Sequence, residues 1–531
     1  MSGAPLPAAA AEAAAATPEA QTSAPPPVPV QWWEKRWTVV VLALLATIPL
    51  LYPRIPPLVD LFGHMGRYRV QLDIDTSPWL RLYYGFHWAM IGNLGVDLLV
   101  MPLGRLIGLE PAVKLIVLAI PPMTAAGFLW VAREVHGRIP PTALFALPFV
   151  YCHPFMFGFV NFALSVGLAF MAFGLWLRLG RLGKFRLRAA LFVPISLVVF
   201  FAHTFGWGML GLLCFSAEAI HEHDQGRRWL RAGVNAALHA SVMALPIVIT
   251  LVWRSEAHGG MTYDWFNWKL KWMWLQDSLR DRWRAFDIAS LVPVGMVLVY
   301  AVVSRQLTFS RNLLFTSFVL LVSFIILPRT VFGSTYADMR LMPYVIATLV
   351  LAIRFRRPIH LPVGRSLAVL GLAFFLMRLG SNTLSLAIAA DDQAAKLTAL
   401  DHVPEGARVV TLSTLPCTGT WALPRDSHLG SMVIVRRHGF ANDQWVLEGL
   451  NLLDLRYTRA GYYSADPSEL VRPNTCTDGL HRQLDTSLSL IPRNDFDYVW
   501  LLDPPPYDER LIADMQPVWR GGGSILYRTQ P

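Results

Sequence analysis

Two ionisable residues follow the first apolar segment of the chain. That segment runs from Trp37 to Tyr52, a proline-rich turn comes next, and Asp60 and His64 stand directly behind the turn. Residues spaced i, i+4 on a helix share one face, and a carboxylate beside an imidazole could move protons or hold a metal. We predict that Asp60 and His64 are catalytic, with an ordinary surface pair as the alternative.

The stretch around this pair, 54–88, is the part of the chain richest in polar residues. Within it, Arg67 is a candidate for substrate binding. Asp73 and Asp75 form an Asp-Ile-Asp unit, whose side chains point the same way on an extended chain. Such a pair suits a divalent cation, Mg²⁺ or Mn²⁺, as a candidate cofactor. A solvated loop is the alternative interpretation of these two carboxylates.

Two further polar sites interrupt apolar sequence. His203 lies at the turn of a tight hairpin between two apolar segments, where an ionisable group is a functional candidate; a histidine satisfied by a nearby carbonyl is the alternative. Asp338 and Arg340 stand just before the apolar segment that begins at 341. We predict that Arg340 binds a phosphate and that Asp338 orients it, with a simple ion pair as the alternative.

The composition indicates a membrane protein. Of 531 residues, 54% are hydrophobic and only 15% are charged, and the mean hydropathy is +0.41. A soluble protein would not expose so much apolar surface. The net charge of +10 could suggest nucleic acid, but the basic residues cluster beside apolar segments, as the positive-inside bias predicts. We therefore expect membrane lipids as partners and no nucleic acid.

The apolar segments predict about 10–12 transmembrane helices. Residues 1–30 are rich in Ala and Pro and predict a disordered cytoplasmic tail, and 31–390 form the membrane domain. After the first segment, the apolar segments lie near 89–107, 112–131, 141–153, 156–178, 188–203, 206–220, 231–253, 284–303, 311–328, 341–354 and 366–388.

The charges of the loops predict the orientation of these segments across the membrane. Basic linkers at 178–188, 227–231 and 354–365 should be cytoplasmic, which places Asp60 outside. The four segments between 89 and 178 then cannot all cross the membrane. Either 89–107 or 141–153 fails to span, and we favour 89–107.

Two regions that are predicted to lie outside the membrane have distinctive compositions. The loop 254–283 mixes tryptophans with basic residues, which predicts an interfacial helix at the lipid headgroups, with contact to a lipid-linked substrate as the alternative. Residues 391–531 have the composition of a small soluble α/β domain, with strands expected at 407–412, 432–435, 498–502 and 524–527 and a helix at 508–515. This domain contains Cys417 and Cys476, which either pair or remain free thiols.

Together these features resemble the GT-C superfamily of integral-membrane glycosyltransferases, of the bacterial envelope type. The matching residues are Asp60 after Pro56-Pro57-Leu58-Val59, the later Asp338 and Arg340, and the soluble region from about 390. The resemblance implies a polyprenyl-phosphate-sugar donor, with Asp60 as base toward the acceptor hydroxyl and Arg340 at the donor phosphate. The family often has adjacent acidic residues in the first loop, whereas Leu61 follows Asp60 here, which puts a metal requirement in question.

We therefore predict a multi-pass protein of the inner (plasma) membrane, with a cytoplasmic N-terminus and a periplasmic C-terminal domain. Its predicted activity is transfer of a sugar from a lipid-linked donor to an envelope glycan, lipid or protein acceptor. One alternative is a transporter or flippase for an envelope lipid or glycolipid, in which the same residues would form a substrate or proton path. Another is a non-catalytic membrane assembly protein.

Overall fold

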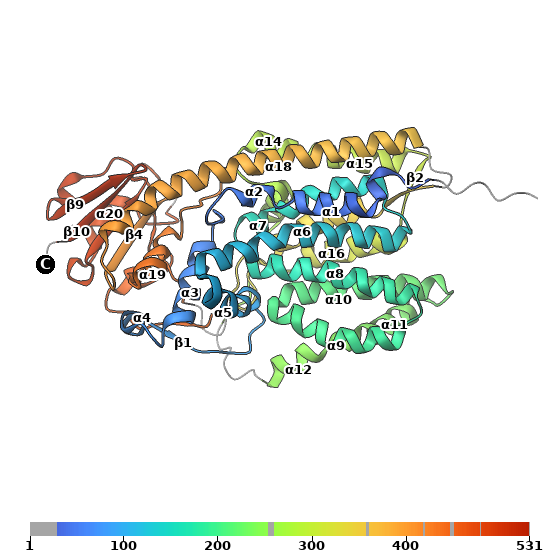
Figure 1. Cartoon of the computed structure of the whole chain (residues 1–531), viewed down its shortest axis with the longest axis horizontal. Coiled ribbons are helices and arrows are strands. Elements are labelled where there is room, and N and C mark those ends of the chain that lie inside the picture. Colours follow the sequence, from blue (N-terminus) through green and yellow to red (C-terminus); the bar gives the residue numbers. More distant parts are fainter. Residues whose placement is uncertain are drawn as a thin grey trace, which may run out of the picture.

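A helical bundle and a smaller α/β region lie end to end in the computed structural model (Figure 1). The predicted tail 1–30 lies almost entirely outside the described residues, and so does part of the predicted loop 254–283. The structure describes residues 29–252, 260–356, 361–417, 420–446, 451–477 and 479–529.

The bundle is built from helices of very different length. The first group is α1 (Arg36–Leu45), α2 (Ile48–Leu51), α5 (Gly95–Ile107), α6 (Leu109–His136), the 3₁₀ helix η2 (Pro141–Tyr151), α7 (His153–Met156), α8 (Val160–Arg181), α9 (Phe185–Ala202) and α10 (Thr204–Asp224). The second is α11 (Trp229–Ala240), η3 (Ser241–Met243), α12 (Leu245–Val252), α13 (Trp268–Gln276), α14 (Arg284–Ala289), α15 (Leu291–Val303), α16 (Arg311–Ile326), η5 (Asp338–Arg340), α17 (Met342–Leu351) and α18 (Leu361–Leu397).

Five of the described helices are long and apolar enough to cross a membrane. They are Leu109–His136, Val160–Arg181, Phe185–Ala202, Arg284–Val303 and Leu361–His402; the bent pair Trp229–Met243 and Leu245–Val252 makes a sixth if it is one span. The predicted class, a helical protein with several apolar helices and a small C-terminal sheet region, is confirmed. The predicted count of 10–12 spans stays a prediction, because the other apolar segments form shorter or more polar helices.

The segments predicted at 89–107 and 141–153, which could not both span the membrane, differ in secondary structure. The segment predicted at 89–107 becomes helical only at Gly95, and α5 packs against α3 (Leu61–Asp73) and α6. The segment predicted at 141–153 forms η2, whose residues are all buried among α6, α17 and α18. Neither is among the described helices that are long and apolar enough to span.

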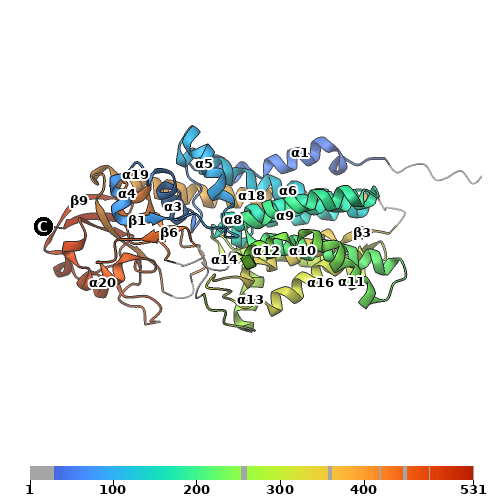
Figure 2. The ribbon, with the colours of Figure 1, turned by 90° about the horizontal axis from the view of Figure 1, so that it is seen from below.

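The basic linkers gather at one end of the bundle, away from the α/β region (Figures 1 and 2). Arg138 pairs with Glu34 at 2.6 Å, so the end of α6 lies beside the start of the chain. At the same end β2 (Leu307–Phe309) pairs antiparallel with β3 (Ile353–Phe355). Loops that the charge pattern assigns to one side therefore share one end of the molecule.

The α/β region has a mixed sheet in the order β5-β4-β8-β10-β9, with β7 beside β4. Its strands are β4 (Arg408–Thr414), β5 (Phe440–Ala441), β7 (Leu470–Val471), β8 (Tyr498–Leu502), β9 (Met515–Gly521) and β10 (Ser524–Thr529). Strands β5, β7 and β8 run parallel to β4, and β10 is antiparallel to β8 and β9.

Three of the four predicted strands are confirmed as β4, β8 and β10. The fourth, at 432–435, is wrong, because these residues begin helix α19 (Met432–Arg437). A four-residue apolar run fits a buried helix as well as a strand. The helix predicted at 508–515 is only the short 3₁₀ helix η10 (Glu509–Ile512), after which strand β9 begins.

The first loop joins the α/β region to the bundle. In the loop, α4 (Pro78–Tyr83) leads into β1 (Tyr84–Phe86), which pairs antiparallel with β6 (Leu453–Leu455). Helix α3 approaches the same region so closely that a Cβ on Gly63 would lie 2.5 Å from the Trp445 ring. Cys417 and Cys476 form a disulfide within the region, so the pairing that the sequence left open is present.

Candidate functional site

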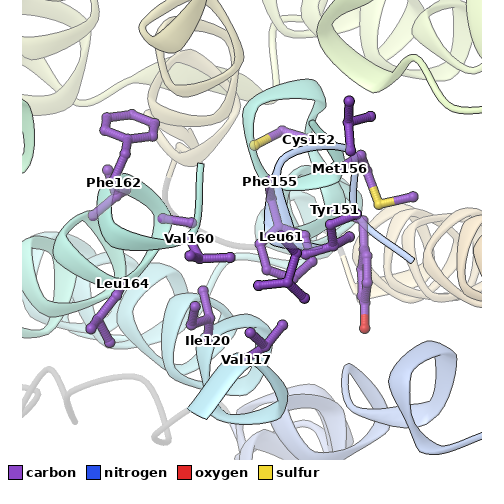
Figure 3. Close-up of a cluster of buried hydrophobic side chains, with 14 of the residues drawn as sticks. Leu61, Val117, Ile120, Tyr151, Cys152, Phe155, Met156, Val160, Phe162 and Leu164 are labelled. Carbon is purple, nitrogen blue, oxygen red and sulfur yellow. The ribbon is translucent and has the colours of Figure 1, made fainter. Parts of the chain in front are cut away.

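Asp60 is held where the bundle meets the α/β region. It is the residue before α3, and its backbone N–H donates to the carbonyl oxygen of Phe157 at 3.0 Å. The next residue, Leu61, is fully buried in an apolar cluster with side chains of α6, η2, α7 and α8 (Figure 3). The backbone hydrogen bond and the buried neighbour Leu61 therefore fix the backbone position of Asp60.

The Asp60 carboxylate does not cap its helix. An aspartate at this position commonly accepts a hydrogen bond from the first turn, but Asp60 makes no such bond. Its side chain is 14% exposed, and Oδ1 lies 3.9 Å from Nε2 of His428. Burial and then the charge of Asp466 raise the pKa of Asp60 well above its ordinary value, and the nearby Arg340 opposes that rise.

Arg340 is a buried guanidinium within an aromatic setting. It is 5% exposed, and its Cζ lies 4.5, 5.9 and 5.2 Å from the ring centroids of Phe159, Phe162 and Phe205. Nη1 donates to Ser334 Oγ at 3.2 Å, whereas Nε has no partner. Burial lowers the pKa of Arg340 to about 10, against the charges of Asp60 and Asp338.

Asp338 does not orient Arg340 by a hydrogen bond, contrary to the sequence-based prediction. It accepts from Lys271 Nζ at 3.2 Å and from the backbone of Met339 at 2.9 Å. Lys271 is 4% exposed, and it also donates to two backbone carbonyls. A buried lysine from the tryptophan-rich stretch is thus the partner of Asp338, which leaves Arg340 without an ion pair among the described residues.

His203 lies beside Arg340. Its ring contacts Phe162 and Phe205, the same rings that surround the guanidinium. Nδ1 of His203 accepts from the backbone N–H of Phe205 at 3.1 Å, so this nitrogen caps α10. The structure therefore brings three predicted site residues, Asp60, His203 and Arg340, to one corner of the bundle.

His64 and Arg67 have different neighbours from His203 and Arg340. The His64 ring packs on Trp445 with centroids 5.0 Å apart, and no hydrogen bond joins it to Asp60 in the part of the chain that is described. Burial, followed by the charge of Arg67, lowers the pKa of His64 well below its ordinary value. Arg67 forms a buried ion pair with Asp97 of α5 at 2.8 Å. Its guanidinium links α3 to α5, and substrate binding by Arg67 stays a prediction.

The Asp-Ile-Asp unit is not an extended chain, which corrects the basis of its predicted metal site. Asp73 ends α3, Ile74 continues in helical geometry, and Asp75 is exposed beyond it. Asp73 pairs with Arg69 and lies 3.7 Å from His438. Neither aspartate belongs to the groups of potential metal ligands found across the described ranges.

Sequence reasoning missed a cluster in the α/β region. His428 and Asp466 lie near Asp60, Asp443 and Glu469 lie beside Asp466, and Trp445 covers His428 with ring centroids 4.4 Å apart. Burial raises the pKa of Asp443 to about 7 and that of Glu469 well above its ordinary value. These residues share no local motif, so only the packing of this region on α3 identifies them.

Helix α13 packs beside the turn that holds Arg340. Trp274 packs on Tyr336 at 5.9 Å, while Trp268 and Trp272 are both 62% exposed. One face of α13 therefore touches the site and the other presents aromatic surface. That arrangement fits the predicted interfacial helix.

No family model and no curated protein matches this chain. Two solved structures are similar to it: ArnT from Cupriavidus metallidurans in the apo state, with a TM-score of 0.49, and the same protein bound to undecaprenyl phosphate, with a TM-score of 0.47. Each is 11% identical, and each match covers 93% of this chain and 98% of the other.

Proposed function

We propose that this protein is a membrane glycosyltransferase of the GT-C type, which moves a sugar from a polyprenyl-phosphate donor to an envelope acceptor. The donor's phosphate would lie at Arg340, and the acceptor hydroxyl at Asp60. The observation that carries the proposal is the buried guanidinium of Arg340, which has no ion-pair partner among the described residues.

A buried cation without a counter-ion is costly to keep. The cost is offset when an anionic ligand supplies the counter-charge, and the planar guanidinium fits two phosphate oxygens at once. Asp60 is near enough for its charge to act on Arg340, yet no ion pair within 4.0 Å joins them. This geometry supports a phosphate between α8, α10 and η5.

The surroundings support a lipid-borne phosphate over a soluble one. Rings of Phe159, Phe162 and Phe205 surround Arg340, and the exposed tryptophans of α13 stand on the far side of the same turn. Tryptophan favours the headgroup level of a bilayer. A polyprenyl chain could therefore remain in the membrane while its phosphate reaches Arg340.

Asp60 is suited to act as a general base. Its carboxylate is free of the helix-capping bond and lies beside His428 of the α/β region. A base must lie within hydrogen-bond reach of the hydroxyl that it activates, and the rigid backbone around Asp60 fixes its position.

The test uses a deletion strain that carries wild-type or variant protein, with envelope glycolipids and glycans compared by mass spectrometry. We expect Asp60→Asn to lose the same hexose or pentose increment that the deletion loses. Asp75→Asn, an exposed carboxylate of the same loop, is the matched control and should restore the increment. Equal membrane levels are checked by immunoblot. Restoration of the full profile by Asp60→Asn would overturn the base assignment and favour a transporter or an assembly protein.

A further inference from the structure

Three potential metal ligands converge beside Asp60. His428 precedes the short 3₁₀ helix η7 (Leu429–Ser431), and Asp466 and Glu469 lie on the segment before β7. One ligand atom from each lies within 4.8 Å of the others. All three come from the α/β region, and none is in the loop 54–88, where the sequence suggested a cation.

Glu469 is the most unusual of the three. It is fully buried, and among the described residues no backbone or side-chain N–H or hydroxyl donates to either of its carboxylate oxygens. Buried carboxylates are normally paired with donors or bound to metals. The groups near Glu469 are the carboxylates of Asp466 and Asp443 and the His428 ring. In their ionised forms both carboxylates can only accept hydrogen bonds or bind a cation.

His428 is oriented as a metal ligand. Its Nδ1 lies 3.0 Å from the backbone carbonyl of Asp443. Because a carbonyl oxygen can only accept, Nδ1 must carry the proton, and Nε2 is then left with its lone pair in the neutral ring. Metal-binding histidines commonly use this arrangement, in which a backbone carbonyl fixes the tautomer. The Trp445 ring packs against the His428 ring at a tilt of 53°, with the centroids 4.4 Å apart.

We propose that His428, Asp466 and Glu469 bind a divalent transition-metal ion, Zn²⁺ or Mn²⁺. An ion at the centre of three atoms that lie within 4.8 Å of one another is at most about 2.8 Å from each. Side-chain rotations that move each ligand atom by less than about 1 Å would then bring the metal–ligand distances to the usual values of roughly 2.0–2.2 Å. One imidazole with two carboxylates favours such an ion over Mg²⁺, which prefers oxygen ligands and retained waters.

This site does not depend on the proposed sugar transfer, since it is defined by residues of the α/β region alone. It does lie next to the candidate base, because Nε2 of His428 is 3.9 Å from Asp60. A cation there would also offset the negative charge that Asp60, Asp466 and Glu469 bring together.

The test measures metal binding, with no activity assay. Full-length protein is purified in detergent, freed of its affinity tag, treated with chelator, and titrated with Zn²⁺ or Mn²⁺. Bound metal is counted by mass spectrometry after gel filtration. We expect about one equivalent in the wild type and in Asp392→Asn, a control from the separate carboxylate group around Lys396. Glu469→Gln should weaken binding at least tenfold.

Thermal unfolding is the second readout. After chelator treatment, addition of Zn²⁺ or Mn²⁺ should raise the midpoint temperature of unfolding of the wild type and of Asp392→Asn. The midpoint temperature of Glu469→Gln should stay unchanged. The proposal is overturned if the wild type binds neither ion, if Glu469→Gln binds as tightly as the wild type, or if Mg²⁺ displaces the bound ion at equal concentration.

Discussion

Gly158 sets the position of Asp60, and its replacement by alanine should displace the carboxylate. Gly158 lies between α7 and α8 at a φ of +100°, and an added Cβ would lie 2.6 Å from the backbone nitrogen of Asp60. Relief of that contact needs a shift of about 0.8 Å, because ordinary contacts begin near 3.4 Å. A displacement of this size commonly lowers catalysis roughly 100-fold, and the strained φ adds about 1–2 kcal/mol of instability.

Gly183 is the matched control for this variant. It also has a positive φ, +67°, but nothing lies within 4 Å of an added Cβ, and it is at the opposite end of α8. Gly183→Ala should therefore share the backbone strain and keep full activity. The assay is the amount of envelope product in the complemented deletion strain, at equal protein levels. Equal activity of Gly158→Ala and Gly183→Ala would refute the claim that this contact positions a working Asp60.

Three further predictions concern binding and stability. Arg340→Gln should lose binding of polyprenyl phosphate in native mass spectrometry while Arg340→Lys keeps part of it; unchanged binding in both would contradict the phosphate assignment. Asp287→Asn should destabilise the protein by about 3–5 kcal/mol, since it leaves Arg378 buried without its counter-ion, and an unchanged thermal midpoint would show that the pair is dispensable. Reduction of the Cys417–Cys476 disulfide, which closes a loop of 59 residues, should cost up to about 4 kcal/mol; equal midpoints with and without reductant would contradict this.

The broad architecture could be predicted from the sequence because it depends on local signals. Apolar segments mark the helices, and the basic linkers do share one end of the bundle (Figures 1 and 2). Strands β4, β8 and β10 could also be predicted, since each is a short run of β-type residues. The run at 432–435 was assigned wrongly because four apolar residues carry no clear period.

The site was only partly predictable because its parts come from distant segments. Asp60, His203 and Arg340 each interrupt apolar sequence, which gives a local signal. Asp466 and Glu469 lie some 400 residues after Asp60 in an ordinary polar stretch. Their approach to Asp60 depends on how the α/β region packs on α3, and no spacing in the chain reports that packing.

The most direct test of the central claim is sugar transfer by the purified protein. Wild-type protein in proteoliposomes is given polyprenyl-phosphate sugars as donors and envelope lipid from the deletion strain as acceptor, and products are measured by mass spectrometry. The account predicts a sugar increment on the acceptor and free polyprenyl phosphate with the wild type, and neither with Asp60→Asn. Equal product from Asp60→Asn, or no product from the wild type with any donor that restores the cellular profile, would contradict it.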